Sequence, residues 1–280
     1  MMRFARVKVD GRAQWAAEVD GSLHSLQGLV ADDGFAALNA AAGRLDAATI
    51  AKAPKLDAGK AQWLQPVPLP GKVVCLGLNY AAHAAEGGHK APEYPAFFMR
   101  ATTSLLAHGE PMVRPRVSDK FDYEAELAVV IGQRARHLTD ADALDCVLGY
   151  SCFNDGSLRD YQRKASQWTI GKNFDATGPI GPWLVPASEL PAGCAGLMIE
   201  SRLNGRVMQS DNTSNMIVSV RHALVLLSEA MTLEPGDVIA MGTPSGVGYA
   251  RNPPVFMKAG DTIEIEIEKV GLLSNKVVDE

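Results

Sequence analysis

Two glutamates lie two positions apart in the stretch FDYEAELAVVIG, residues 121–132, which otherwise has the composition of a buried β-strand. Because side chains alternate between the two faces of a strand, we expect Glu124 and Glu126 to point into the same space, with Tyr123 and Ala125 on the other face. If that space is dry, each carboxylate raises the cost of ionising the other. A positive group between them is therefore expected.

A third carboxylate, Asp155, follows an apolar run in the stretch SCFNDGSLRDYQ. Three carboxylates without a nearby pair of Cys or His residues favour a hard cation such as Mg²⁺ or Mn²⁺, with water or substrate oxygens completing an octahedral shell. Zinc suits this set of ligands less well. The sequence therefore indicates a candidate metal site at Glu124, Glu126 and Asp155.

The residue pattern alone also allows a plainer interpretation, in which Glu124 and Glu126 form salt bridges on a half-exposed sheet face. The same chain contains a second stretch of alternating glutamates, IEIEIEK, with Glu264, Glu266 and Glu268. We expect these three to form such a solvated face. Alternation by itself does not distinguish the two cases.

The stretch LGLNYAAHAAEGGHK contains His83 and Glu86 three positions apart, which places both on one face if the segment is helical. A histidine oriented by a carboxylate can take a proton from water. His89 extends the spacing to HxxExxH, which could hold a metal, but Gly87 and Gly88 interrupt the helix that would carry it. The alternative for His83 and Glu86 is a local surface interaction. The glycines also predict a mobile segment, as a lid requires.

Two further residues lie in turn-rich surroundings. Lys172, in WTIGKNFDATGPIGPW, is either an ordinary surface lysine or a cation that stabilises an enolate or carboxylate. Thr243, in AMGTPSGVG, lies where glycines permit close approach of the backbone to a ligand, although a plain tight turn explains the same pattern.

The elements that must position these residues are strand-rich. Residues 1–65 alternate apolar and polar residues around two Asp-Gly turns and then become Ala-rich with helical spacing, which predicts a small N-terminal domain. A proline-rich linker, QPVPLPGK, separates it from residues 66–280. There, β runs such as YEAELAVVIG, GLMIESRLNG and DTIEIEIEKVG are interspersed irregularly with helices predicted at DADALDCVLGY and SVRHALVLLSEAM. This order predicts an α+β fold rich in antiparallel strands.

Composition excludes several classes of function. The chain is 47% apolar with a formal net charge of -5 and no block of like charge, so it offers no basic face for nucleic acid and no polybasic membrane patch. Its start is charged, and no apolar run approaches the roughly 20 residues that span a bilayer. Four isolated cysteines predict buried thiols in a reducing cytoplasm.

Taken together, the segments from about Lys72 to the C-terminus resemble the fumarylacetoacetate hydrolase family, in particular its acylpyruvate hydrolases and 5-carboxymethyl-2-hydroxymuconate isomerase-like members, which act in aromatic compound catabolism. The segments that carry the resemblance, in order, are GLNYAAHAAE, PAFFMR, DYEAELAVVIG, GYSCFNDGSLRDYQ, GKNFDATGPIGPW, NGRVMQSDNTSNM, LEPGDVIAMGTPSGVG and GDTIEIEIEKVGLLSN. Many short motifs in the right order make the resemblance specific.

The resemblance implies a mixed β-sandwich roll, usually homodimeric, behind a small N-terminal α/β domain, with a lid at about residues 80–92. It implies that the carboxylate set binds Mg²⁺ or Mn²⁺. The site residues implied are His83, Glu86 and Lys172 for catalysis, Arg100, Arg159, Gln162 and Thr243 for substrate binding, and Glu124, Glu126 and Asp155 for the metal. Two positions depart from the family pattern, since Arg100 replaces a frequent lysine and Gly156 replaces a larger residue.

The activity implied is hydrolysis of a carbon–carbon bond in 1,3-dicarbonyl 2-oxo acids of the acylpyruvate type, with water activated by His83. The same enolate chemistry serves decarboxylation of 2-oxo acids such as oxaloacetate and isomerisation or hydration of unsaturated 2-oxo diacids, so these stay open as alternatives. A non-catalytic protein that binds a small ligand through its metal is a further alternative.

Overall fold

The computed structural model describes residues 1–88, 90 and 92–280. Its N-terminal part is a meander of β1 (Met2–Val9), β2 (Arg12–Val19) and β3 (Ser22–Ser25). Asp10 and Gly11 both have positive φ (49° and 79°), as do Asp20 and Gly21, so both predicted Asp-Gly turns are confirmed as tight hairpin turns. The Ala-rich stretch forms α1 (Phe35–Ala42) and α2 (Ala47–Ile50), and β4 (Gln62–Leu64) returns to pair with β1.

The larger sheet runs through the whole molecule. Its strand order is β3-β2-β1-β13-β11-β10-β16-β5-β6, with β7 added on β13. The bounds are β5 (Val73–Gly77), β6 (Ala96–Arg100), β7 (Leu105–Ala107), β10 (Ala125–Ile131), β11 (Val147–Asn154), β13 (Gly178–Pro186) and β16 (Val238–Ala240). Phe4 of β1 pairs with Leu184 of β13, so the N-terminal meander continues the sheet. The division into residues 1–65 and 66–280 stays a prediction.

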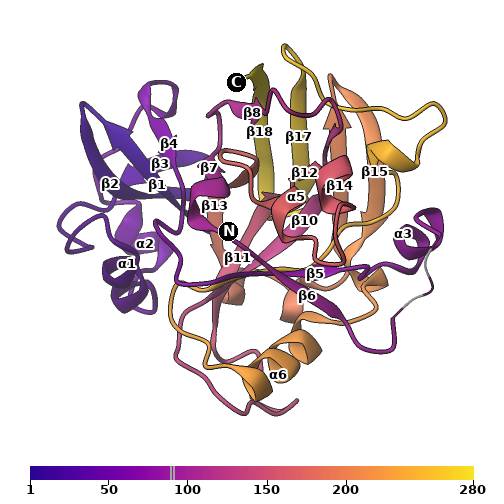
Figure 1. Cartoon of the computed structure of the whole chain (residues 1–280). Coiled ribbons are helices and arrows are strands. Elements are labelled where there is room, and N and C mark those ends of the chain that lie inside the picture. The colour runs from indigo at the N-terminus through magenta and orange to yellow at the C-terminus, as the bar shows by residue number, and fades with distance from the viewer. Residues whose placement is uncertain (89, 91) are drawn as a thin grey trace.

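A second sheet packs against the first. Its strands, in order, are β15 (Arg206–Asn212), β14 (Met198–Leu203), β17 (Thr262–Ile267), β18 (Gly271–Asp279) and β8 (Met112–Arg114), and a short pair joins β9 (Phe121–Asp122) to β12 (Ser157–Leu158). Figure 1 shows β14, β15, β17 and β18, in orange to yellow, facing β10 and β11. Leu127 and Val129 of β10 share one apolar core with Ile263 and Ile265 of β17. The α+β, strand-rich fold class is confirmed.

The alternate residues of β10 are also buried. Ala128 and Val130 belong to a second core with Phe4 and Leu38 of the N-terminal part. Both faces of β10 are therefore covered, and every residue of the strand is buried. A polar side chain on such a strand has no access to bulk water except through a cavity.

The remaining helices are short. They are α3 (Ala81–Glu86), α4 (Arg159–Gln162), α5 (Thr169–Lys172), α6 (Val220–Ala230) and the 3-10 helices Ala58–Lys60, Thr102–Ser104, Ala187–Glu189, Ala192–Cys194, Thr213–Asn215 and Gly248–Ala250. The helix predicted in SVRHALVLLSEAM is confirmed as α6, whose first turn is capped by Ser219.

The helix predicted in DADALDCVLGY is wrong. Asp142 accepts hydrogen bonds from the backbone nitrogen and the hydroxyl of Thr139 (2.6 and 2.9 Å), which ties this segment into successive turns. Residues from Val147 onward then join β11. Local side-chain bonds of this kind compete with a helix.

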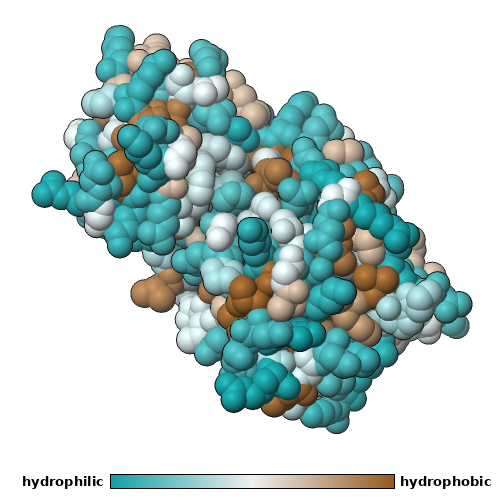
Figure 2. Space-filling view, turned by 90° about the horizontal axis from the view of Figure 1, so that it is seen from above, coloured by the Kyte–Doolittle hydropathy of each residue, from teal (hydrophilic) through white to brown (hydrophobic). Residues whose placement is uncertain are grey.

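Hydrophilic residues predominate on the face in Figure 2, where hydrophobic residues form several small groups. Within the described residues, none of the helices combines the length and apolar character that crossing a bilayer requires. All four cysteines are buried and free, as predicted.

Candidate active site

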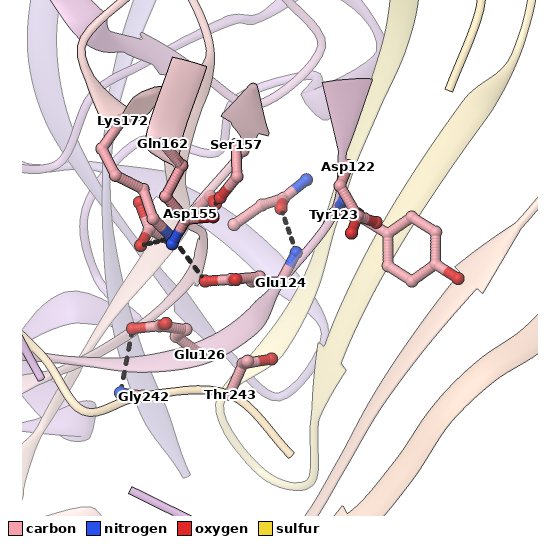
Figure 3. A network of polar contacts seen from close by, with 12 residues as sticks. Asp122, Tyr123, Glu124, Glu126, Asp155, Ser157, Gln162, Lys172, Gly242 and Thr243 are labelled. Carbon is pink, nitrogen blue, oxygen red and sulfur yellow. Dashed lines mark hydrogen bonds and ion pairs between the residues drawn. The ribbon is translucent and has the colours of Figure 1, made fainter. Parts of the chain in front are cut away.

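The three predicted metal ligands converge. Glu124, Glu126 and Asp155 each offer a carboxylate oxygen, and these oxygens lie within 4.8 Å of one another. The three residues are 4%, 1% and 0% exposed, which removes the half-exposed salt-bridge interpretation. They meet because Ala125 of β10 pairs with Asn154 of β11, which places Asp155 beside Glu124. The cluster is visible in Figure 3.

The strand that carries the glutamates is interrupted. β9 ends at Asp122 and β10 begins at Ala125, because the backbone nitrogen of Glu124 donates to the Asn154 side chain (2.9 Å) rather than to a neighbouring strand. The alternation nevertheless holds, since Tyr123 points away from the carboxylates (Figure 3). The single uninterrupted strand predicted from FDYEAELAVVIG is thus wrong in this detail.

Lys172, at the end of α5, is a cation that pairs with Glu124 and Asp155, whereas the sequence predicted a cation between Glu124 and Glu126. Its ammonium donates to Glu124 Oε2 and to Asp155 Oδ2, both at 2.7 Å, and the residue is 2% exposed. The surface-lysine alternative is therefore excluded. The backbone reaches this position because Gly171 lies against Gln162, where an added Cβ would come within 2.3 Å of the Gln162 nitrogen.

Arg159, in α4, is a second buried cation. Its Nη1 lies 2.7 Å from Glu124 Oε1 and donates to Gln162 Oε1 at 2.9 Å, and its Nε donates to Asp122 Oδ2 at 2.8 Å. Asp122 was not predicted as a site residue. It lies two positions before Glu124, so the same alternation that links the two glutamates could have identified it.

Arg100, at the end of β6, is the third buried cation. Its guanidinium pairs with Asp155 and also donates to Gly156 O (3.1 Å), Ser104 Oγ (3.1 Å) and Thr177 Oγ1 (2.8 Å). Arg100 lies beneath the carboxylates and is not among the residues that line the cavity. Gly156 is explained by its neighbour, since a Cβ there would meet Thr177 O at 2.1 Å.

His83 and Glu86 form the predicted pair on α3. The Nδ1 of His83 lies 2.8 Å from Glu86 Oε1, and Glu86 Oε2 accepts from the backbone nitrogen of Gly246 at 2.8 Å. With the Nδ1 proton donated to Glu86, Nε2 is free to accept a proton. His89, the last residue of HxxExxH, lies outside the described residues.

Thr243 and Gln162 complete the set. The Gln209 amide donates to Thr243 Oγ1 (2.7 Å) and to Pro244 O (2.8 Å), and its oxygen accepts from Ala125 N (3.0 Å). The Thr243 hydroxyl proton is therefore free for a ligand. Gln209 therefore links β10 to the loop that carries Thr243. Gln209 was not identified from the sequence, because its local sequence gives no sign of a contact with residues so distant along the chain.

One cavity of about 370 Å³ brings these groups together. The polar residues that line it are His83, Glu124, Glu126, Arg159, Gln162, Arg163, Ser166, Lys172, Thr243 and Tyr249, and its apolar wall contains Leu76, Leu78, Phe98 and Trp168. Trp168 lies directly over Gly77, where a Cβ would come within 2.1 Å of its ring. Of the predicted site residues, Glu86, Arg100 and Asp155 are not part of this lining. Glu86 contacts His83, Arg100 pairs with Asp155, and the Asp155 carboxylate belongs to the cluster with Glu124 and Glu126.

The charges of the cluster do not balance. Burial raises the pKa of Glu124, but Lys172, Arg159 and His83 together outweigh it and lower that pKa to about 2. Burial, together with Asp155 and Glu124, raises the pKa of Glu126 well above its ordinary value. Lys172 keeps its charge, because Asp155 and Glu124 outweigh the effect of burial and raise its pKa.

Glu126 is thus the carboxylate without a cation. Its carboxylate accepts a hydrogen bond from the backbone nitrogen of Gly242 at Oε2 (2.9 Å), and it forms no ion pair with any residue that the structure describes. Asp122, Glu124, Glu126 and Asp155 together face three cations within the described chain. A divalent ion would compensate the remaining charge, and buried oxygen donors are the ligands that Mg²⁺ and Mn²⁺ prefer. The residues present therefore fit such an ion.

The sequence model for the family described as fumarylacetoacetate (FAA) hydrolase, C-terminal, matches residues 72–278. The chain belongs to the fumarylacetoacetate hydrolase family. This match confirms the resemblance predicted from the sequence, and the protein is an enzyme of this family.

Known proteins of the family differ in the activities their names state. The human mitochondrial oxaloacetate tautomerase FAHD2A is 41% identical over 82% of this chain and 74% of its own length. A solved fumarylacetoacetate hydrolase from psychrophilic Exiguobacterium antarcticum is 35% identical, with a TM-score of 0.90 and complete coverage of both chains. Maleylpyruvate hydrolase from Sphingobium sp. SYK-6 is 28% identical, with a TM-score of 0.83 over 99% of this chain and 100% of that one.

Proposed function

We propose that the protein is a divalent-metal-dependent hydrolase that cleaves a carbon–carbon bond in a 1,3-dicarbonyl 2-oxo acid of the acylpyruvate type. One observation carries the proposal. A histidine oriented by a carboxylate lines the same 370 Å³ cavity as Glu124, Glu126 and Lys172. The first group can activate water, and the second can hold the cation that this reaction needs.

Glu124, Glu126 and Asp155 would hold the ion, and Arg100 fixes the orientation of Asp155 from behind. Bound there, Mg²⁺ or Mn²⁺ would act as a Lewis acid toward the 2-oxo and carboxylate oxygens of the substrate. The chain's own residues must then place the substrate, activate water and move the proton.

His83 Nε2 takes a proton from water, and the water oxygen attacks the distal carbonyl carbon of the substrate. The bond between that carbon and the central carbon breaks, and its electron pair stays on the 2-oxo acid fragment as an enolate. The proton held by His83 then passes to the central carbon. The products are a carboxylic acid and a shorter 2-oxo acid.

The other cavity residues orient the substrate and stabilise charge. Lys172 Nζ offsets negative charge as the carbon–carbon bond breaks. The Thr243 hydroxyl, which Gln209 leaves free to donate, receives a substrate carboxylate, and Gln162 adds a hydrogen bond. Holding the water close to the carbonyl contributes as much as activating it.

Keto–enol tautomerisation of oxaloacetate is a second candidate, because the relative named for it is 41% identical. It requires the same cation site and proton transfer by His83 between carbon and oxygen, but no attack by water. Decarboxylation or isomerisation would use the same enolate.

A substrate panel distinguishes these activities. Acetopyruvate, the enol form of oxaloacetate and unsaturated 2-oxo diacids are assayed with Mg²⁺, with Mn²⁺ and with EDTA. We expect acetopyruvate to give acetate and pyruvate when the metal is present, and NMR detects both products. Ketonisation of oxaloacetate without cleavage of any 1,3-dicarbonyl acid would favour the tautomerase. Binding without turnover of any member would favour a non-catalytic protein. The cytoplasmic location and the homodimer expected from the sequence stay predictions.

A further inference from the structure

At one end of the cavity, two arginines lie against a single tyrosine ring. The guanidinium carbons of Arg159 and Arg163 are each 4.5 Å from the ring centroid of Tyr249, and all three residues line the cavity. Each cation is attracted to the ring, but the two like charges repel each other. A negative group beside them would remove that repulsion.

Arg159 has a donor left over. Its Nε and Nη1 are used by Asp122, Glu124 and Gln162, whereas its Nη2 is buried and has no hydrogen-bond partner among the residues that the structure describes. The side chain of Arg159 is 5% exposed. A buried donor without an acceptor is costly, so an acceptor supplied by a ligand would be strongly preferred here.

Arg163 also has a charge that no carboxylate of the described chain pairs with. It is exposed, follows α4 directly, and forms no ion pair with any carboxylate in the described part of the chain. Its long side chain can swing toward the cavity while its charge stays in water. Arg159 provides a fixed donor and Arg163 an adjustable one.

The arrangement is fixed before a ligand arrives. The Asp122 carboxylate accepts from the backbone nitrogens of Gly248 (2.8 Å) and Tyr249 (3.0 Å) and from Arg159 Nε (2.8 Å). A Cβ at Gly248 would lie 1.9 Å from Val255 O, so this close approach requires glycine. One buried carboxylate therefore holds both the ring and the guanidinium, which reduces the ordering cost on binding.

The charge of the whole cavity agrees with an anionic ligand at this end. With a divalent ion in place, the ion and the cations Arg100, Arg159 and Lys172 exceed the four carboxylates of this cluster by one positive charge. Arg163 adds another. A ligand with one negative group would leave one positive charge uncompensated, whereas a ligand with two would leave none.

We infer that the end of the cavity formed by Arg159, Arg163 and Tyr249 binds a second anionic group, so that the substrate is a 2-oxo dicarboxylate. This inference rests on the proposed function, which places the 2-oxo acid group at the carboxylate cluster. A carboxylate is the group best matched to the two guanidinium forks. The leaving acyl group of the proposed reaction would then carry a carboxylate.

Matched ligand pairs test this inference without turnover. Binding of 2-oxoglutarate and 2-oxopentanoate, and of 2-oxoadipate and 2-oxohexanoate, is measured by calorimetry on the Mg²⁺-loaded protein. The members of each pair differ only in a terminal carboxylate. For at least one pair we expect the diacid to bind about tenfold more tightly than the monoacid.

Three variants identify the residues responsible. Arg163→Gln should bring the ratio of the two affinities close to one, and Arg163→Lys should restore part of it. Lys164→Gln removes the neighbouring charge, which does not line the cavity, and should leave the ratio unchanged. Since Arg163 is exposed, its replacement should not disturb folding.

The outcomes separate this inference from the function on which it rests. Equal Mg²⁺-dependent affinities for diacid and monoacid, or the same loss for both in Arg163→Gln, would overturn the second anion site and leave the proposed function intact. A preference for diacids that does not depend on Mg²⁺ would support the anion site but contradict the proposed function. Absence of binding by every ligand would overturn both.

Discussion

The chain uses alternating glutamates twice, with opposite results. At β10, Glu124 and Glu126 are buried and face a cavity. At β17, Glu264 and Glu266 lie on the outer face, with side chains 26% and 38% exposed, while the isoleucines between them pack in the core. Alternation fixes which side chains share a face, and the elements that cover that face decide whether it becomes a site.

The two groups also differ in their balance of charge. On the surface, Arg202 of β14 contacts Glu264 (3.3 Å), Glu266 (2.6 Å) and Glu200 (2.5 Å) in partly exposed pairs. Such pairs are worth little individually, because water screens them. In the buried cluster, Glu126 pairs with no cation among the residues that the structure describes, and its burial keeps bulk water from offsetting its charge. We therefore expect the buried glutamates to bind a cation and to lower the stability of the metal-free protein. We expect the exposed glutamates to have neither effect.

The largest expected difference between the buried and the exposed glutamates is in metal binding. Glu126→Gln keeps the shape of the side chain and removes one of three ligand charges, so we expect the affinity for Mn²⁺ to fall by at least about 100-fold and turnover to fall by about 10⁴-fold. Calorimetric titration with Mn²⁺ and steady-state assays measure both.

Glu266→Gln is the matched control on the exposed strand and should bind Mn²⁺ with unchanged affinity. Comparable losses in both variants would mean that the buried cluster is not the metal site.

The second difference concerns His83, the proposed proton acceptor, which lines the same cavity as the buried glutamates. His83→Asn should lower kcat by about 10² to 10⁴-fold, because it removes the group that takes the proton, while Mn²⁺ affinity stays the same. His222→Asn, on the exposed side of α6, is the control. Retention of full activity by His83→Asn would contradict the proposed proton transfer.

The third difference is in how much the cation beside each set of glutamates contributes to the free energy of unfolding. Lys172→Met leaves Glu124 and Asp155 short of a charge in a buried space, and we expect the free energy of unfolding of the metal-free protein to fall by about 3 kcal/mol. Arg202→Met, at the exposed group, should lower it by at most about 1 kcal/mol. Urea unfolding in EDTA compares the two, and equal losses would show that burial does not separate these networks.

The smallest effect is a dependence of stability on pH. Since the folded-state pKa of Glu126 is raised, its contribution to stability is complete below the ordinary pKa of 4.5 and is lost as pH rises through the raised value. Glu124 behaves oppositely, since its pKa is lowered to about 2 and its contribution is lost as pH falls from 4.5 toward that value.

Glu126→Gln should therefore make the metal-free protein more stable than wild type at about pH 8, by on the order of 1 kcal/mol, and should give no gain at about pH 4. Glu266→Gln should show no such gain at either pH. Urea unfolding at the two pH values tests this, and a loss of stability at the higher pH would show that Glu126 is not an uncompensated charge.

Much of the site could be predicted from local pattern. The two-residue period brought Glu124 and Glu126 together, and the three-residue spacing brought His83 to Glu86. Residue types made Asp155, Lys172 and Thr243 candidates, and the family resemblance was needed to group them in one site, because each joins the site from a different element. Residue types alone left a structural alternative open for each of them.

The contacts that the sequence did not reveal are long-range or depend on single side chains. The Asn154 amide interrupts the predicted strand at Glu124, and Thr139 with Asp142 replaces a predicted helix by turns. Arg100 saturates its donors beneath the cluster, and Gln209 reaches Thr243 across the sheets. Packing between distant segments determines such contacts, and periodicity does not record it.

Anomalous diffraction from crystals grown with Mn²⁺ would show whether the three buried carboxylates hold a divalent ion. We expect one peak per chain at roughly 2.1 Å from oxygens of Glu124, Glu126 and Asp155. A well-ordered site without a peak there, or a single peak at the glutamates of β17 instead, would contradict the account.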